Sequence, residues 1–156
     1  MPRNRHFGKR GAQLAEERSS LAHRIIHVWL RFRLTKALLG SLAASARETG
    51  SALVLNISSD AAINAYPRWG AYGASKAALH HMTRIWGEEL KSAGIHFLSV
   101  DPGDMDTALH RAAVPGSDRS TLKRPEAAAH EIAETIAKVL TRLPVTLQEM
   151  HGSVCP

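Results

Sequence analysis

The chain has 156 residues, of which 44% are hydrophobic and 22% are charged, and its formal net charge is +6 at pH 7. This length is typical of a single domain that can bury a core. No stretch resembles a membrane-spanning helix or the apolar part of a secretory signal, and the single cysteine, Cys155, cannot form an internal disulfide. We therefore expect a cytoplasmic protein with no membrane partner.

The positive charge is confined to the N-terminal fifth of the chain. Residues 1–33 hold eight basic and two acidic side chains, whereas residues 34–156 hold twelve of each. This basic arm has no recognisable nucleic-acid-binding motif, so we expect no nucleic-acid partner. We interpret residues 1–11 as a basic, disordered tail that precedes one domain over residues 12–156.

The first predicted element is helical. From residue 12 to about residue 49, apolar side chains recur at spacings of three and four. This pattern predicts one long helix, or two helices joined near residues 19–20 or at Gly40. His23 and His27 stand four apart on it, a spacing that can hold a metal ion. No third ligand accompanies them at a telling spacing, so we predict no metal site.

Two apolar runs predict a pair of buried strands. The first covers Ala52–Ile57 and the second covers Ile95–Val100. Between them the periodic segment 77–91 predicts a helix, which Gly94 ends. A strand, a helix and a strand in this order predict a right-handed crossover between parallel neighbours, so the fold belongs to the α/β class.

Polar residues with chemical potential lie between the first strand and this helix. Ser59 follows the strand, and Tyr72 and Lys76 stand one turn apart at the helix start, with β-carbons about 5–6 Å apart. Tyrosine is a poor acid or base near neutrality, because its ordinary pKa is about 10. A neighbouring ammonium group and the positive end of a helix dipole both favour the phenolate. Ser59 adds a hydroxyl that can donate to or accept from a reacting oxygen, so the three residues are candidates for proton transfer.

The segment 101–107 leaves the carboxyl end of the second strand, where ligands bind in parallel α/β sheets. Thr107 has two interpretations: it contacts a ligand, or it caps a short helix that begins at Ala108. Further on, Pro125 is expected at the first position of a helix that runs to about Leu140.

At these residues the chain resembles the short-chain dehydrogenase/reductase family. The resemblance extends from about residue 32 to about residue 140. Its motifs are Asn56-Ile-Ser-Ser59, Tyr72-Gly-Ala-Ser-Lys76, and Pro102-Gly103 followed by Thr107. The resemblance implies a Rossmann-like parallel sheet flanked by helices. It also implies an oxidoreductase that uses NAD or NADP to interconvert a small carbonyl compound and a secondary alcohol.

The resemblance assigns a role to each of these residues. Tyr72 would exchange a proton with the substrate oxygen, Lys76 would favour the tyrosinate and hold ribose hydroxyls, and Ser59 would orient the substrate oxygen. The implied cofactor-binding residues are Tyr72, Lys76, Pro102, Gly103 and Thr107. Segment 108–124 would be a mobile substrate lid.

The family arrangement also implies surroundings for this site. Tyr66 and Trp69 would flank the substrate pocket. The helices 28–49 and 72–91 would face a second subunit in a homo-oligomer. The apolar stripe of the second of these helices therefore has two interpretations, a dimerisation surface or a face packed on the sheet of its own chain. Its residues are Ala78, Met82, Ile85, Trp86 and Leu90.

Two features of the family pattern are absent from the sequence. No two of the eleven glycines stand two positions apart, so the pyrophosphate-binding turn Gly-x-x-x-Gly-x-Gly cannot occur. No asparagine lies between residues 5 and 55, where the family places a catalytic asparagine. We therefore predict a partial Rossmann-like fold that lacks the first βαβ units and carries an extra N-terminal helix.

Two functions remain open. In the first, the chain is a short-chain NAD(P)-dependent oxidoreductase whose proton transfer uses Tyr72, Lys76 and Ser59. In the second, it is a truncated, catalytically incompetent member of the family that acts at most through its helical surfaces.

Overall fold

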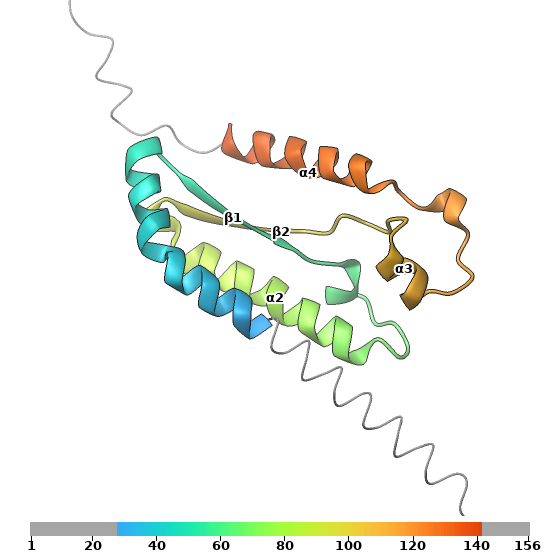
Figure 1. Ribbon diagram of the computed structural model, residues 1–156. Coiled ribbons are helices and arrows are strands. Elements are labelled where there is room, and N and C mark those ends of the chain that lie inside the picture. The colour runs from blue at the N-terminus through green and yellow to red at the C-terminus, as the bar shows by residue number, and fades with distance from the viewer. Residues whose placement is uncertain (1–27, 142–156) are drawn as a thin grey trace, which may run out of the picture.

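The computed structural model describes residues 28–141, which form an α/β arrangement around two parallel strands (Figure 1). A helix over residues 28–49 comes first. The elements that follow, in which η marks a 3-10 helix, are β1 (Ala52–Ile57), η1 (Asp60–Ala62), α2 (Gly70–Glu89), η2 (Lys91–Ala93), β2 (Ile95–Val100), α3 (Ala108–Ala113), η3 (Arg119–Thr121) and α4 (Pro125–Leu140). The predicted tail and residues 12–27 of the predicted first helix lie outside the described residues.

The elements form layers on the two sides of the strands. Helix 28–49 and α2 lie on one side of the strands, and α4 lies on the other (Figure 1). The partial α/β fold class predicted from the sequence is confirmed.

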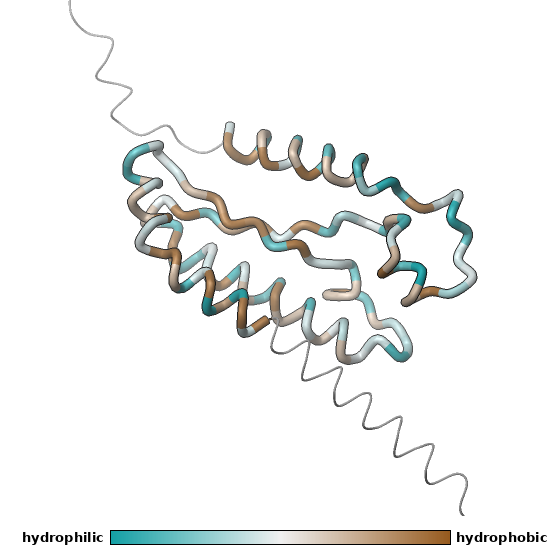
Figure 2. The backbone as a smooth tube through the Cα atoms, in the orientation of Figure 1, coloured by the Kyte–Doolittle hydropathy of each residue, from teal (hydrophilic) through white to brown (hydrophobic). Residues whose placement is uncertain are grey.

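The two predicted strands are confirmed, and they pair in parallel. Ala52 lies opposite Ile95, and Ile57 lies opposite Val100. The pairing continues past β1, because the N–H of Ser58 donates to the carbonyl of Val100 at 2.7 Å. Both strands are rich in apolar residues (Figure 2). Because the strands are parallel, their carboxyl ends meet at one edge, and the segments that begin at Ser58 and Asp101 leave the sheet side by side.

The core lies where helix 28–49 meets the strands. Its buried members are Ala46, Ala52 and Ile95, and the partly buried side chains packed on them are Leu39, Leu42, Ala43, Val54, Leu90 and Phe97. Aromatic stacking extends this contact to α2. The ring of Trp86 lies 5.2 Å from that of Phe32 and 5.6 Å from that of Phe97, measured between centroids. Trp86 therefore joins helix 28–49, α2 and β2.

A buried polar chain fixes α2 against β1. The side-chain amide of Asn56 donates to the hydroxyl of Thr83 at 3.0 Å, and this hydroxyl donates to the carbonyl of Leu79 at 2.7 Å. All three residues are buried. Leaving a buried polar group without its partner costs about 1–3 kcal/mol. A shift of α2 along β1 would break these hydrogen bonds, so they favour one position of the helix on the strand.

The structure corrects the predicted bounds of the central helix. The prediction gave 77–91, or 72–91 with the tyrosine and lysine included, whereas α2 runs from Gly70 to Glu89 and residues 91–93 form the separate turn η2. Gly94 ends this turn in the left-handed conformation, with φ of 71°, so its predicted capping role is confirmed.

The predicted apolar stripe of α2 belongs to two different faces. The buried residues of the helix are Leu79, Thr83 and Trp86. Ala78 and Ile85 are exposed, in contrast, and they line a groove against helix 28–49 instead of packing on the sheet. A helix between a sheet and a neighbouring helix has apolar residues on both faces, and a single-stripe interpretation merges the two.

Within residues 28–141, no helix is both long and apolar enough to cross a membrane. No group of three or more His, Cys, Asp or Glu side chains in the same residues is arranged to hold a metal ion. His23 and His27 lie outside this part of the chain.

Candidate active site at the carboxyl ends of the strands

Ser59 stands two residues after the end of β1 and begins the turn η1. Its extended backbone lets the side-chain oxygen accept a hydrogen bond from the N–H of Ala61 at 3.2 Å, which is the arrangement of a helix N-cap. Its hydroxyl also donates to the carboxylate of Asp60 at 3.2 Å. The neighbouring Ser58 is buried, and its hydroxyl has no hydrogen-bond partner among the described residues.

The first turn of α2 packs closely on η1. A β-carbon added at Gly73 would lie 3.0 Å from the carbonyl oxygen of Ala61, so the absence of a side chain permits this approach. No side chain caps the helix at Trp69, and Arg68 just before it has a positive φ of 69°. This turn carries Tyr72, so the contact brings the phenol-bearing turn beside the segment that Ser59 opens.

Tyr72 and Lys76 share one face of α2, as the sequence predicts. The ammonium nitrogen of Lys76 lies 5.6 Å from the centroid of the Tyr72 ring. The same ammonium donates a hydrogen bond to the carbonyl of Ile57, the last residue of β1, at 2.9 Å. Lys76 therefore places its positive charge between the phenol ring and the strand end that leads to Ser59.

A chain of aromatic rings continues from the phenol into the preceding loop. The Trp69 ring meets the Tyr72 ring edge-on, with centroids 5.5 Å apart, and the Tyr66 ring lies 5.5 Å from Trp69. The expectation that Tyr66 and Trp69 flank a substrate pocket stays a prediction, although both rings are grouped with Tyr72.

Asp60 is a polar residue of this region that sequence reasoning missed. Its carboxylate accepts hydrogen bonds from the hydroxyl groups of Tyr66 and Ser59. The bond from Tyr66 is the main reason that the pKa of Asp60 is lowered from 3.8. The same bond raises the pKa of the Tyr66 phenol above its ordinary value of 10. A signal was present in the sequence, because Ser followed by Asp after a strand is typical of a capped turn.

The second strand contributes the turn at Pro102-Gly103. Gly103 has a positive φ of 74°, a conformation that favours glycine, and its N–H donates to the carboxylate of Asp101 at 3.0 Å. Thr107 accepts a hydrogen bond from the N–H of His110 at 3.1 Å and is the N-cap of α3. The capping interpretation of Thr107 is therefore confirmed, and its contact with a cofactor stays a prediction.

The segment predicted as a substrate lid contains two short helices, α3 and η3. Its connections include Lys123, a second residue that sequence reasoning missed. The ammonium group of Lys123 donates to the carbonyl of Pro102 at 3.3 Å and to the carboxylate of Glu131 on α4 at 2.5 Å. No local sequence pattern predicts a contact between residues 21 positions apart.

The residues at this edge fit the nicotinamide end of a dinucleotide better than its pyrophosphate end. The ammonium of Lys76 and the side-chain-free turn at Gly103 are a polar group and a stretch of backbone that a ligand can approach. A pyrophosphate needs a row of backbone N–H groups at a glycine-rich turn, and the glycine spacing of this sequence provides none.

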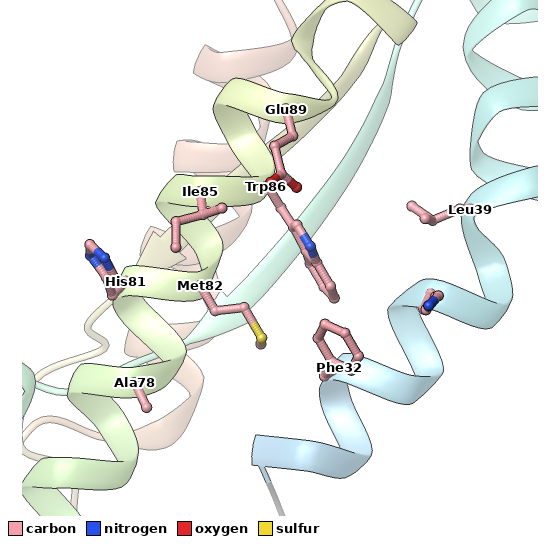
Figure 3. Close-up of a pocket in the computed structure, with 9 residues that line it drawn as sticks. Phe32, Leu39, Ala78, His81, Met82, Ile85, Trp86 and Glu89 are labelled. Atoms are coloured by element: carbon pink, nitrogen blue, oxygen red, sulfur yellow. The ribbon is translucent and has the colours of Figure 1, made fainter.

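The one cavity described lies away from these residues. It is a groove of about 650 Å³ between helix 28–49 and α2 (Figure 3). The Phe32 ring, the Trp86 ring and the Met82 side chain converge in it (Figure 3). None of the candidate site residues is among its lining residues, which are Phe32, Lys36, Leu39, Ala78, His81, Met82, Ile85, Trp86 and Glu89.

Comparisons with known proteins agree with this architecture. The chain is 41% identical over 63 residues to a benzil reductase ((S)-benzoin forming) of Bacillus subtilis, an alignment that covers 39% of this chain and 26% of that protein. A putative short chain dehydrogenase of Escherichia coli CFT073, solved in complex with NADPH, superposes with a TM-score of 0.56 at 30% identity. A similar protein of Shigella flexneri, complexed with NADP, gives a TM-score of 0.55 at 30% identity.

The extent of these matches is partial. The E. coli superposition covers 62% of this chain and 38% of the solved one, and the Shigella superposition covers 61% and 38%. The chain thus spans little more than a third of the length of these relatives, in agreement with the predicted resemblance to the C-terminal part alone. The family model described as short chain dehydrogenase matches residues 12–118, well over half of the sequence, and the chain belongs to this family.

Proposed function

We propose that this chain carries the proton-transfer part of an NAD(P)-dependent oxidoreductase site that interconverts a small carbonyl compound and a secondary alcohol. The observation that carries the proposal is the position of the Lys76 ammonium, 5.6 Å from the Tyr72 ring centroid and bonded to the carbonyl that ends β1. This position places a fixed positive charge beside the one phenol that shares its helix face. A phenol near a fixed cation suits general acid–base work, because the cation stabilises the phenolate left after proton donation.

In carbonyl reduction, the Tyr72 hydroxyl gives its proton to the substrate oxygen while the carbonyl carbon receives a hydride, and the C=O double bond becomes a C–OH single bond. In alcohol oxidation the phenolate accepts that proton. A bound nicotinamide dinucleotide supplies or accepts the hydride in this chemistry. The Lys76 ammonium stabilises the phenolate, and Ser59 orients the substrate oxygen through its hydroxyl.

The residues that we propose to bind the cofactor lie near the same edge of the sheet. We propose that Tyr72 and Lys76 hold the nicotinamide ribose and that Pro102, Gly103 and Thr107 contact the nicotinamide ring. The solved relatives complexed with NADP and NADPH support this class of cofactor. Because the sequence holds no glycine-rich turn for the pyrophosphate, we expect no saturable binding of NADH or NADPH in the micromolar range.

The relatives also indicate a class of substrate. The Bacillus subtilis relative is named for the reduction of benzil to (S)-benzoin, in which a ketone next to an aromatic ring becomes a secondary alcohol. The aromatic rings of Tyr66 and Trp69 beside Tyr72 suit such a substrate, since aromatic pairs contribute about 0.5–1.5 kcal/mol beyond their buried area.

The test uses the full chain with benzil as the substrate and NADPH at up to millimolar concentrations. Benzoin formation is measured by chromatography. Tyr72→Phe is expected to lower the rate about 10²- to 10⁴-fold, the usual contribution of a general acid. Lys76→Met is expected to lower it as well, whereas the matched control Lys91→Met, an exposed lysine beyond the other end of α2, should not.

Circular dichroism checks that each variant is folded. A wild-type chain that forms no benzoin, or a Tyr72→Phe variant that keeps the full rate, would contradict the proposed function. Saturation at micromolar NADPH would contradict only the expectation that the cofactor binds weakly, and not the proposed reaction.

A second candidate function is a helical docking surface, and the groove between helix 28–49 and α2 favours it. Its lining combines apolar side chains, including Phe32, Met82 and Ile85, with the charged side chains of Lys36 and Glu89. Protein interfaces typically combine apolar and polar side chains in this way. We propose that a second copy of the chain covers this groove.

A further inference from the structure

The segment between β2 and α4 is a loop whose two ends are joined by main-chain hydrogen bonds. The N–H of Lys123 donates to the carbonyl of Asp104, and the N–H of Asp106 donates to the carbonyl of Lys123, both at 2.9 Å. These bonds form a parallel bridge between Met105 and Lys123. We call residues 104–123 the closed loop.

One carboxylate holds the interior of the closed loop together. Asp106 accepts hydrogen bonds from Arg111 at 2.8 Å and from two nitrogens of Arg119 at 2.6 and 3.2 Å. Arg111 belongs to α3 and Arg119 belongs to η3, so both short helices are fixed to the base of the loop. The two guanidinium groups, Arg119 first, lower the pKa of Asp106 from 3.8, so the carboxylate stays charged at neutral pH.

The side chain of Lys123 connects this base to two other parts of the molecule. Its ammonium donates to Glu131 of α4 at 2.5 Å and to the carbonyl of Pro102 at 3.3 Å. The ammonium also lies close to Gly103, the next residue of the turn, because a β-carbon added there would be 3.6 Å from the ammonium nitrogen. The Lys123 side chain is 32% exposed, which leaves this charge partly shielded from water.

We infer that Lys123 is a positioning residue that holds the Pro102-Gly103 turn and makes this turn and the closed loop move together. Its main chain forms the base of the loop, and its side chain supports the turn. A ligand that displaces the turn therefore also displaces the closed loop, and a movement of the closed loop also displaces the turn. The importance of this coupling for catalysis rests on the proposed function, whereas the coupling itself can be measured without a ligand.

The test is amide hydrogen exchange, followed by NMR on the full chain. Lys123→Met keeps the aliphatic stem and the main-chain bonds but removes the donor. The amides of Gly103 and Asp106 are expected to exchange about five- to tenfold faster, as suits the loss of a partly exposed hydrogen bond of ordinary net strength. Lys123→Arg, which retains a cationic donor, should restore most of the protection.

The matched control is Lys138→Met. Lys138 lies on α4, where its exposed ammonium pairs with Glu134 at 3.5 Å. Its replacement should leave the exchange of Gly103 and Asp106 unchanged. If Lys123→Met does not fold, Glu131→Gln removes the negative charge that pairs with the same ammonium, and the same two amides should respond in the same direction.

The outcomes separate this inference from the proposed function. Wild-type exchange rates at both amides in the folded variants would contradict the positioning role, and a response at Gly103 without one at Asp106 would contradict the coupling. A chain that forms no benzoin but shows both responses would refute the proposed reaction and leave the role of Lys123 supported.

Discussion

At the scale of single residues, contacts of a few charged side chains, one of them long-range, hold the candidate site together. Lys76 reaches across 19 positions of sequence to the last carbonyl of β1. The carboxylate of Asp60 accepts hydrogen bonds from the hydroxyl groups of Ser59 and Tyr66. Through Asp60, the loop before α2 is therefore connected to Ser59. Through Lys76, α2 is connected to the end of β1. The geometry around Tyr72 depends on both connections.

The pairing of Asp60 and Tyr66 predicts a change in titration. Because the phenol hydroxyl is the main cause of the lowered pKa of Asp60, Tyr66→Phe should raise that pKa toward 3.8. A carboxyl group with a lowered pKa stabilises the folded state above its unfolded pKa, and this stabilisation is lost as the pH falls through the folded value. The variant should therefore have less of this stabilisation above about pH 4, and less of it to lose as the pH falls below that value.

Carboxyl carbon NMR across this range measures the effect. Tyr72→Phe removes the only other tyrosine of the chain and serves as the control, since Tyr72 is not among the groups that shift Asp60. An unchanged Asp60 titration in Tyr66→Phe would show that the bond does not exist in solution.

The sequence was informative about some of these residues and silent about others. Tyr72 and Lys76 could be selected because a spacing of four places two side chains on one helix face, and Thr107 could be recognised as a cap because its hydroxyl precedes a helical segment. Lys123 could not be selected, because its partners Pro102 and Glu131 are brought to it only by the closure of the loop.

At the scale of elements, regular patterns were enough for the strands and for α4, while α2 was predicted with its start displaced. Both strands are short apolar runs between turn residues, and α4 begins at Pro125 as its sequence indicates. The start of α2 gave no such signal. Its N-cap position is Trp69, which makes no side-chain capping bond, and Arg68 just before this N-cap has a positive φ of 69°.

Two glycines in these elements should respond to alanine in opposite directions. Gly94 has a positive φ, and an added β-carbon would lie 3.3 Å from that of Ala46, so Gly94→Ala should destabilise the chain by about 1–2 kcal/mol. Gly40 is inside helix 28–49 with nothing within 4 Å, so Gly40→Ala should stabilise it by about 1 kcal/mol through helix propensity.

Urea unfolding, followed by circular dichroism, gives both free energies. The pair serves as its own control, because both variants add one methyl group. A stabilising Gly94→Ala would show that the turn after η2 is not left-handed in solution.

At the scale of the whole molecule, the family could be predicted from the sequence, whereas the packing of helix 28–49 on the rest of the chain could not. Motifs of a few residues are local, so the family could be recognised from the strand ends and the start of α2. The division of α2 into a sheet face and a groove face was not predicted, because it depends on where helix 28–49 lies. That position follows from packing around Trp86, which no local periodicity encodes.

The groove leads to a prediction about assembly. If a second copy covers it, the wild-type chain should be a dimer at tens of micromolar, and Ile85→Lys should convert it to a monomer by placing a charge in an apolar contact. Leu140→Lys is the matched control, since Leu140 is 43% exposed on α4 and Ile85 is 44% exposed. Sedimentation velocity measures both. A wild-type monomer at every concentration, or a dimer that survives Ile85→Lys, would contradict the prediction.

The packing of Trp86 between two phenylalanines also gives the molecule an internal optical reporter. Trp86 is 8% exposed, whereas Trp29 is 56% exposed, and Trp69 is the only other indole in the chain. The blue edge of the emission spectrum should therefore come mainly from Trp86. If helix 28–49 separates from the rest of the chain before the strands unpair, this edge will shift to the red while the far-ultraviolet signal is still largely intact, and the order of the two changes will show which layer opens first.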